Sequence, residues 1–534
     1  MRTKKALLNS ATALLLELVT VVCGFILPGL ILSAFGSKYN GITSSISQFL
    51  GYIALLKSGI GGVTRASLYK PLQENDVDGV SAIVMATEKF MRQIALIFSG
   101  FLVVFAALYP FFKSKEFPWL FSFTLVLILG IGTFSQYYFG ITYQMLLQAD
   151  QRQYISSAVQ IVTTIVNTIV AAILIKAGGS IHVVKLGSAI VFALNPIVIN
   201  IYVRKKYKIN RKIAPNTSAI AQRWDSFAHQ IANFVHGNTD VAILTIFSAF
   251  TYSDISVYSV YAMVVSGVRK LVNTLASGME AAFGNMIAKK EDKLLLKNME
   301  LLEFVILYVG GFCFACAIVL IVPFVLVYTS KVHDADYNRP LFGTLLCVAE
   351  LLWCVRIPYQ SVVLAGGKFK ETRNGAIAEP IINIVISVIL VFKLGLVGVA
   401  IGTLVAMAFR TVQYAVYMSK HIVPRSLWVF VRKISIAAIC ITLSCLAANY
   451  VKRECGNYFD WMILACMRAG IIFVIHMIFI MIFERKNFVL FWKKLGGIFK
   501  RKAKKKAKEE AKEEATEERK ETENDTEGKD QSGQ

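Results

Sequence analysis

Charged residues are scarce in this sequence outside its last segment. Only 17% of the 534 residues are Asp, Glu, Lys or Arg and 56% are hydrophobic, whereas about a quarter of the residues in a soluble domain are charged. Many of the Lys and Glu residues lie from Arg501 onward, so the remainder of the chain is more apolar still. One water-soluble core cannot hide that much apolar surface. The composition therefore predicts a protein whose natural solvent is lipid.

The sequence also lacks the motifs of familiar enzymes. It contains no P-loop, no GxSxG and no HExxH. The predicted outer loops are short, which argues against a membrane glycosyltransferase or polymerase, because such an enzyme builds its active site from extramembrane chain. We expect no enzymatic activity, no cofactor and no ATP hydrolysis by this chain.

The nine cysteines form neither a disulfide framework nor a metal motif. All but Cys455 fall within apolar stretches, and the CxxC pair Cys313 and Cys316 has no histidine nearby. Small apolar filler explains them better than a redox or metal site does. We expect no metal.

Apolar runs of spanning length recur along the chain, whereas the short alternating strands of a membrane barrel are absent. The first run follows Arg2, Lys4 and Lys5 and is too long for a cleaved signal peptide, so we interpret it as a retained span. We predict an all-α integral membrane protein with about 14 transmembrane helices. Their approximate positions are 6–34, 41–69, 86–112, 117–147, 155–176, 183–203, 226–250, 256–286, 301–329, 341–365, 374–393, 396–419, 429–451 and 459–484.

Lysine and arginine are divided unevenly between the predicted loops. With the N-terminus inside, the inner segments carry more than twice as many of them as the outer segments, to which we assign Lys113 and Lys185. Because positive loops remain in the cytoplasm, we predict a multi-pass protein of the inner (cytoplasmic) membrane with both termini cytoplasmic. The net charge of +23 then reflects topology and contact with anionic lipid heads. We expect no nucleic-acid partner.

A weak internal repeat divides the chain. Tyr143 matches Tyr359 and Asn167 matches Asn383 at an offset of 216 residues, and further pairs follow at an offset of 215. The offset spans an even number of helices, so both halves enter the membrane in the same direction. This predicts two six-helix lobes related by a pseudo-two-fold axis along the membrane normal, plus two C-terminal helices. The predicted parts are an N-terminal lobe 1–205, a cytoplasmic linker 206–223, a C-terminal lobe 224–420, two additional helices 421–485 and a charged cytoplasmic tail 486–534.

Ionisable residues within the predicted spans are candidate functional groups, because a charge in lipid is costly unless it faces a partner or a cavity. Lys57 and Arg65 share one helix face, and Glu379 precedes Pro380, which frees a backbone carbonyl mid-helix. Structural roles remain open for all of them, through snorkelling or packing. The full set is Glu17, Lys57, Arg65, Asp240, Arg269, Glu280, Glu350, Arg356, Glu379 and Arg410.

Several segments resemble a known transporter family. They are LSAFGSKYNGI (32–42), KSGIGGVTRASLYKPL (57–72), LLQADQRQYISSAVQIV (146–162), HGNTDVAILTIF (236–247), VYSVYAMV (257–264) and GNMIAKK (284–290). In the order and general character of these segments, over roughly residues 1–485, the chain resembles the Wzx-type flippases of polysaccharides and lipid-linked oligosaccharides. These belong to the multidrug/oligosaccharidyl-lipid/polysaccharide exporter superfamily. The fourteen helices are similar in number to those of the lipid II flippases of that superfamily.

The resemblance implies a transporter whose two lobes alternate between inward-open and outward-open states. Its substrate would be a lipid-linked glycan, bound by Lys57, Arg65 and Arg269 through its pyrophosphate, with the repeat-related Asn167 and Asn383 as further candidates. Glu17, Asp240 and Glu379 would bind H⁺ or Na⁺ for coupling. The implied partners are membrane lipids and the glycan polymerase or glycosyltransferases that act on the same glycan.

Three other functions remain open. A multidrug or cation antiporter of the same superfamily would share fold and topology. A membrane glycosyltransferase or polymerase is disfavoured by the short outer loops. A non-transporting scaffold would use the charged tail to recruit cytoplasmic partners.

Overall fold

Helices make up the chain in the residues that the computed structural model describes, which are 2–52, 60–113, 115–217, 239–247, 250–276, 279–494 and 496, and no strand occurs among these. Twelve helices there are long and apolar enough to cross a membrane. They match twelve of the fourteen predicted spans; the other two, 41–69 and 226–250, include residues outside the described ranges. The chain is an all-α, multi-pass membrane protein, as its composition predicts.

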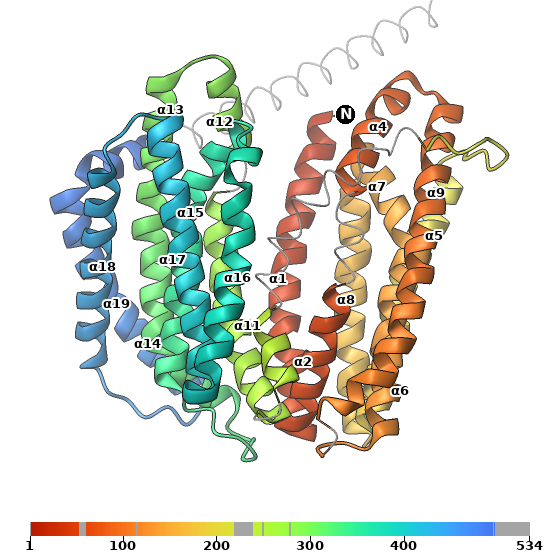
Figure 1. Cartoon of the computed structure of the whole chain (residues 1–534), viewed down its shortest axis with the longest axis horizontal. Coiled ribbons are helices and arrows are strands. Elements are labelled where there is room, and N and C mark those ends of the chain that lie inside the picture. The colour runs from red at the N-terminus through yellow and green to blue at the C-terminus, as the bar shows by residue number, and fades with distance from the viewer. Residues whose placement is uncertain are drawn as a thin grey trace, which may run out of the picture.

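The first half of the chain forms one group of helices, on the right of Figure 1. Its elements are α1 (Arg2–Phe35), α2 (Ser37–Tyr52), α4 (Ile60–Glu74), α5 (Val77–Leu108), η1 (Tyr109–Phe111), α6 (Trp119–Ser135), η2 (Gln136–Gly140), α7 (Ile141–Ala149), α8 (Gln153–Lys176) and α9 (Ile181–Lys206). The π-helix η2 joins α6 to α7 within one membrane-length segment, Trp119–Ala149. Such a bulge is often found at a functional site.

The second half forms the group on the left of Figure 1. After the helical residues 239–246, its elements are α11 (Tyr252–Leu275), α12 (Met279–Ala288), α13 (Asp292–Phe304), η4 (Val305–Gly310), α14 (Gly311–Tyr328), α15 (Pro340–Ala365), α16 (Phe369–Leu394), α17 (Leu396–His421), α18 (Leu427–Asn449) and α19 (Tyr458–Phe483). Helices α18 and α19 pack on α14 at the edge of this group. Glu303 of α13 fixes this edge through buried ion pairs with Arg425 at 2.6 Å and Lys433 at 2.7 Å.

The internal repeat is visible in the helix bounds. Helices α9 and α17 both contain 26 residues and begin at Ile181 and Leu396, an offset of 215. Helices α2 and α11 begin at the same offset, and α8 and α16 begin 216 residues apart. The two halves therefore repeat the same order of helices. The limits of the lobes, linker and tail at 205, 223, 420 and 485 remain predictions.

Side-chain caps and breakers explain several of these bounds. Asp76 accepts a hydrogen bond from the N–H of Gly79 and begins α5, and Thr251 forms a capping box with Asp254 at the start of α11. These caps show that α5 begins nine residues before the predicted span, and α13 likewise begins at Asp292 rather than near 301. The apolar pattern marks where lipid begins, whereas the helices continue beyond it.

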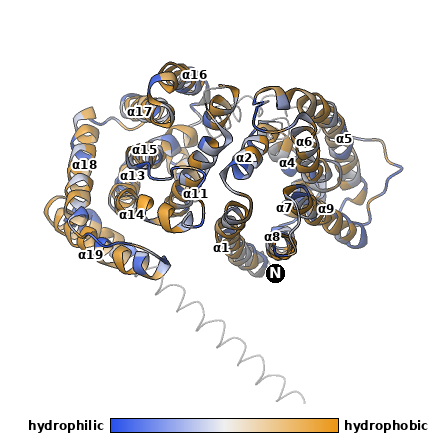
Figure 2. Ribbon diagram, turned by 90° about the horizontal axis from the view of Figure 1, so that it is seen from below, coloured by the Kyte–Doolittle hydropathy of each residue, from blue (hydrophilic) through white to orange (hydrophobic). Residues whose placement is uncertain are grey.

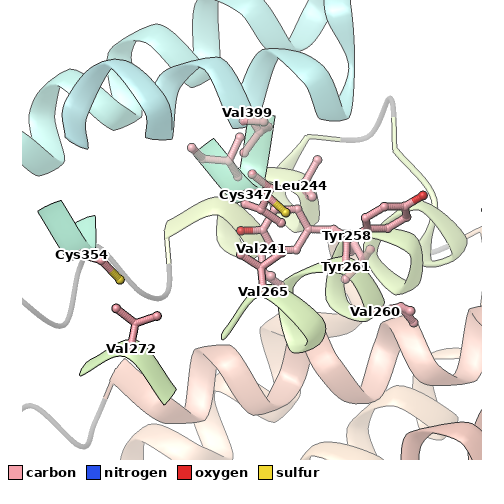
Figure 3. Packing of buried hydrophobic residues seen from close by; sticks show 14 of the residues in the cluster. Val241, Leu244, Tyr258, Val260, Tyr261, Val265, Val272, Cys347, Cys354 and Val399 are labelled. Atoms are coloured by element: carbon pink, nitrogen blue, oxygen red, sulfur yellow. The ribbon is translucent and has the colours of Figure 1, made fainter. Parts of the chain in front are cut away.

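Buried side chains pack the helices of the second group against one another. Figure 3 shows Val241, Leu244, Tyr258 and Tyr261 packed beside Val399. The outward faces stay apolar as well: Figure 2 shows hydrophobic residues around both groups, with α1, α2 and α11 between them. Helix α1 has only 6% of its most apolar stretch buried. These exposed apolar faces fit a lipid environment.

Candidate functional site

A polar cavity lies between the two groups of helices, and we call it the inter-lobe cavity. Its volume is about 500 Å³. Small hydroxyl and amide side chains of α2 and α11 line it beside apolar residues of α1. The lining residues are Leu27, Pro28, Ile31, Asn40, Thr43, Ser44, Ser47, Gln48, Lys185, Val241, Tyr258, Ser259, Ala262, Met263 and Ser266. A cavity of this kind can accept a polar group inside the membrane.

Hydrogen bonds between α2 and the second half join the two groups at one end, which we call the closed end. Asn40 Nδ2 donates to Ser256 Oγ at 2.8 Å. The carboxylate of Asp334 accepts from the backbone N–H and the hydroxyl of Ser37 at 2.8 and 2.6 Å. A Cβ on Gly41 would lie 1.7 Å from the carbonyl oxygen of Tyr252. Only glycine permits the backbones to approach this closely.

Two charged residues in the segment between α5 and α6 strengthen the closed end. Lys113 Nζ donates to the carbonyl oxygens of Phe247 and Phe250, and Glu116 accepts from the N–H of Tyr252 at 3.1 Å. Burial lowers the pKa of Lys113 and raises the pKa of Glu116. The opposite charge of the neighbouring group counteracts each pKa shift.

A second cavity, which we call the side cavity, lies within the first group of helices and shares Leu27 and Lys185 with the inter-lobe cavity. Its volume is about 440 Å³. It is lined by Leu27, Leu129, Gly132, Thr133, Gln136, Gln144, Gln160, Asn167, Lys185, Ser188, Ala189, Phe192, Asn195 and Pro196. Amide side chains from η2, α7, α8 and α9 thus converge on one space.

Asp240 is buried in the second half, with 5% of its surface exposed. Its Oδ2 accepts hydrogen bonds from the hydroxyls of Tyr258 and Thr403, both at 2.8 Å, and its Oδ1 accepts from Asn383 Nδ2 at 3.4 Å. Ser387 donates to Asn383 Oδ1 at 3.1 Å. No Lys, Arg or His forms an ion pair with Asp240 in the described part of the chain. The structure therefore brings together two predicted site residues, Asp240 and Asn383.

Glu379, by contrast, is paired with two cations. Its Oε1 lies 2.9 Å from Arg356 Nη1 and its Oε2 lies 3.4 Å from Arg410 Nε, with all three side chains buried. Arg410 also donates to Tyr414 and to the carbonyl oxygen of Thr372. This arrangement is typical of a structural ion cluster that joins α15, α16 and α17. Both Arg356 and Arg410 are buried, so neither extends its charge to the membrane surface.

The remaining predicted residues are dispersed. Arg269 pairs with Glu350 at 3.1 Å. Glu17 is half-exposed and lies 3.3 Å from Lys270 of the other group. Arg65 donates to Gln148 at 2.6 Å. Lys57 lies outside the described residues.

Sequence reasoning missed Lys185. We assigned it to an outer segment, but it lies one turn inside α9 and lines both cavities. The signal was present, since the predicted span 183–203 already contains residue 185. Within the described ranges, no group of His, Cys, Asp and Glu residues could hold a metal ion.

Comparisons with known proteins identify the fold. No family model and no curated protein matches the sequence. Among solved structures, the lipid II flippase MurJ in an inward closed conformation matches 90% of this chain and 99% of its own, with a TM-score of 0.68 at 15% identity. An inward-facing multidrug resistance MATE transporter of the MOP superfamily matches 75% of this chain and 94% of its own, with a TM-score of 0.59 at 15% identity.

A eukaryotic MATE transporter matches 82% of this chain and 98% of its own, with a TM-score of 0.53 at 13% identity. At these identities the likeness concerns the fold. The chain has the two-lobed helical fold that these transporters share.

Proposed function

We propose that this chain is a transporter that flips a lipid-linked oligosaccharide across the cytoplasmic membrane by alternating access. The observation that carries the proposal is the polar inter-lobe cavity, formed between two repeated groups of helices and sealed at one end by the contacts of Gly41 and Asn40. Two repeats that rock about a central polar site supply the two states that alternating access requires.

The predicted orientation assigns the closed end to the outer side of the membrane. Helix α1 begins at Arg2, which we predict to be cytoplasmic, and ends at Phe35 beside the closed end. The conformation would then be inward-facing. An apolar lipid tail can stay in the bilayer, beside the exposed apolar face of α1, while the glycan enters the cavity.

Cations near the cavity suit a pyrophosphate linkage. Lys185 lines the cavity, and Arg269 uses one nitrogen, Nη1, for both bonds to Glu350. The other guanidinium nitrogens of Arg269 are left to bind phosphate oxygens. Arg65 and Lys57 remain predicted contacts on the first lobe.

Asp240 is the best candidate for ion coupling. A buried carboxylate without a cationic partner is costly unless it binds a proton or a cation. The oxygen atoms of Asp240, Tyr258 and Thr403 lie close together, which suits Na⁺ as well as H⁺. A bound ion can drive the cycle only if its affinity differs between the two states, and Asp240 bonds to α11, which forms part of the closed end.

A multidrug or cation antiporter is the second candidate function. The carboxylate of Asp240, without an ion-pair partner in the described residues, favours it, because an antiporter can exchange a cation for a proton at one such group. The fold is shared by transporters of both kinds, so only the transported substrate distinguishes a flippase from an antiporter here. A glycan polymerase or glycosyltransferase as partner, and any role of the tail from residue 486 onward, remain predictions.

The deciding experiment is a flipping assay in proteoliposomes with a lipid-pyrophosphate-linked oligosaccharide, with and without an imposed H⁺ or Na⁺ gradient. We expect translocation that depends on the protein and increases with one gradient. Absence of translocation, together with efflux of a cationic dye from the same vesicles, would replace the flippase by the antiporter. Protein with residues 486–534 deleted should still flip the lipid, whereas a scaffold would lose its function.

A further inference from the structure

The two repeat-related asparagines, Asn167 and Asn383, differ in their hydrogen bonding. Asn383 on α16 is bonded to Asp240, Thr403 and Ser387. Its counterpart Asn167 on α8 is 2% exposed, yet its Oδ1 is buried without a hydrogen-bond partner. Where the second half places a carboxylate against this asparagine, the first half has the open side cavity.

Unpaired polar groups surround this space. Within the described residues, the side-chain amides of Gln136, Gln144 and Gln160 and the ammonium group of Lys185 make no hydrogen bond or ion pair. Gln136, Gln144 and Lys185 are partly buried and Gln160 is exposed, but Asn167 Oδ1 is fully buried, and buried polar groups in proteins are almost always bonded. A cation and several amides left without partners around one cavity therefore indicate a site that a polar ligand completes.

The chemistry of the lining defines the ligand. An amide both donates and accepts hydrogen bonds, which matches hydroxyl groups that do the same, whereas a lysine only donates and matches an anionic oxygen. Phe192 adds an apolar ring to the wall. The cavity of about 440 Å³ falls within the roughly 300–1,000 Å³ of small-molecule sites.

We infer that the side cavity is a subsite for an acidic sugar unit of the transported glycan. Asn167 and the glutamines bind the sugar hydroxyls, and Lys185 binds a carboxylate or phosphate on the same sugar. This inference rests on the proposed function. Because Lys185 lines both cavities, the subsite opens beside the path that the glycan takes between the lobes.

Direct binding tests the subsite independently of transport. The probes are methyl glucuronide, methyl glucoside and inorganic phosphate, added to the full-length protein in lipid nanodiscs. We expect Lys185→Gln to weaken glucuronide binding about tenfold, as the loss of one charge-assisted bond implies, and to leave glucoside binding unchanged. Asn167→Leu should weaken both sugars. Lys176→Gln is the matched control, since Lys176 lies on the same lobe, is exposed and lines neither cavity.

The outcomes separate the two proposals. Equal glucuronide binding by the Lys185→Gln and Lys176→Gln variants, or no binding of glucuronide to the unaltered protein, overturns the subsite. Phosphate binding as tight as glucuronide binding and indifferent to Asn167→Leu also overturns it, because the site would then recognise an anion without a sugar. If proteoliposomes flip neutral and acidic substrates at the same rate in both lysine variants, the flippase stands and the subsite falls.

Discussion

At the scale of single residues, the balance of charge within the chain distinguishes functional from structural groups. Glu379 is neutralised by two arginines, so its ionised form is satisfied in the folded protein. Asp240 and Lys185 have no partner of opposite charge in the described part of the chain. A charge without a partner inside a membrane is costly, and the two residues carry the opposite signs that the proposed function expects of groups that bind a coupling cation and an anionic cargo.

Replacing Asp240 with Asn should remove coupling without unfolding the protein. The amide keeps the shape of the side chain but can no longer bind H⁺ or Na⁺ as an anion. We expect the stimulation of flipping by the effective gradient to disappear, measured as the ratio of rates with and without that gradient. Asp78→Asn, at an exposed position of α5, should preserve the ratio. Full stimulation in the Asp240→Asn protein would exclude this residue from coupling.

Replacing Glu379 with Gln should mainly destabilise the fold. The change leaves the guanidinium groups of Arg356 and Arg410 buried without their carboxylate, and breaking a buried ion pair in this way costs about 3–5 kcal/mol. Thermal unfolding of the purified protein should show a clear loss, while Glu371→Gln, at an exposed position of the same helix, shows almost none. A stable Glu379→Gln protein that has lost ion coupling would restore the coupling role predicted for Glu379.

At the scale of elements, the contact between α2 and α11 depends on a glycine. Gly41 lets the first turns of the two helices meet at backbone distance, and Asn40 and Ser37 add hydrogen bonds on either side. Backbone contact fixes the distance between the lobes more sharply than long side chains could. The strength of the closed end therefore resides in a few residues at the start of α2.

Gly41→Ala should open the closed end. Its Cβ would overlap the carbonyl oxygen of Tyr252, so α2 and α11 must separate. In a protein with Ser44→Cys, we expect faster labelling by a membrane-impermeant maleimide added from the closed side. Gly24→Ala, whose Cβ would meet nothing within 4 Å, is the matched control and should leave the labelling rate unchanged. Unchanged labelling in the Gly41→Ala protein would show that the contact does not seal the cavity.

The sequence predicts the helices better than it predicts their ends and partners. Apolar runs locate the spans because lipid demands them, and the repeat identifies Asn167 and Asn383 as equivalent. Lys185 was misplaced because a single cation at the edge of an apolar run looks the same in a loop and in a first turn. The two arginines around Glu379 could not be foreseen, since the pairing depends on how α15, α16 and α17 pack.

At the scale of the whole molecule, the two repeated halves have diverged in charge while keeping their helix order. The second half carries the buried carboxylate of Asp240. The first half carries Lys185, which lines the side cavity together with Asn167, whose Oδ1 has no hydrogen-bond partner. Both residues are close to the inter-lobe cavity, since Lys185 lines it directly and Asp240 is bonded to Tyr258, which also lines it. Motion of one half against the other would change the access of both sites together.

Alternating access predicts that fixing the closed end stops transport. Asn40 and Ser256 are hydrogen bonded across the two halves at 2.8 Å, so a protein with Asn40→Cys and Ser256→Cys should form a cross-link on oxidation. We expect flipping to cease in the oxidised double variant and to return after reduction. The unaltered protein, whose nine cysteines receive the same oxidant, and the two single variants are the controls. Undiminished flipping by fully cross-linked protein would mean that the lobes need not part at this end, and the cargo would then have to leave by another route.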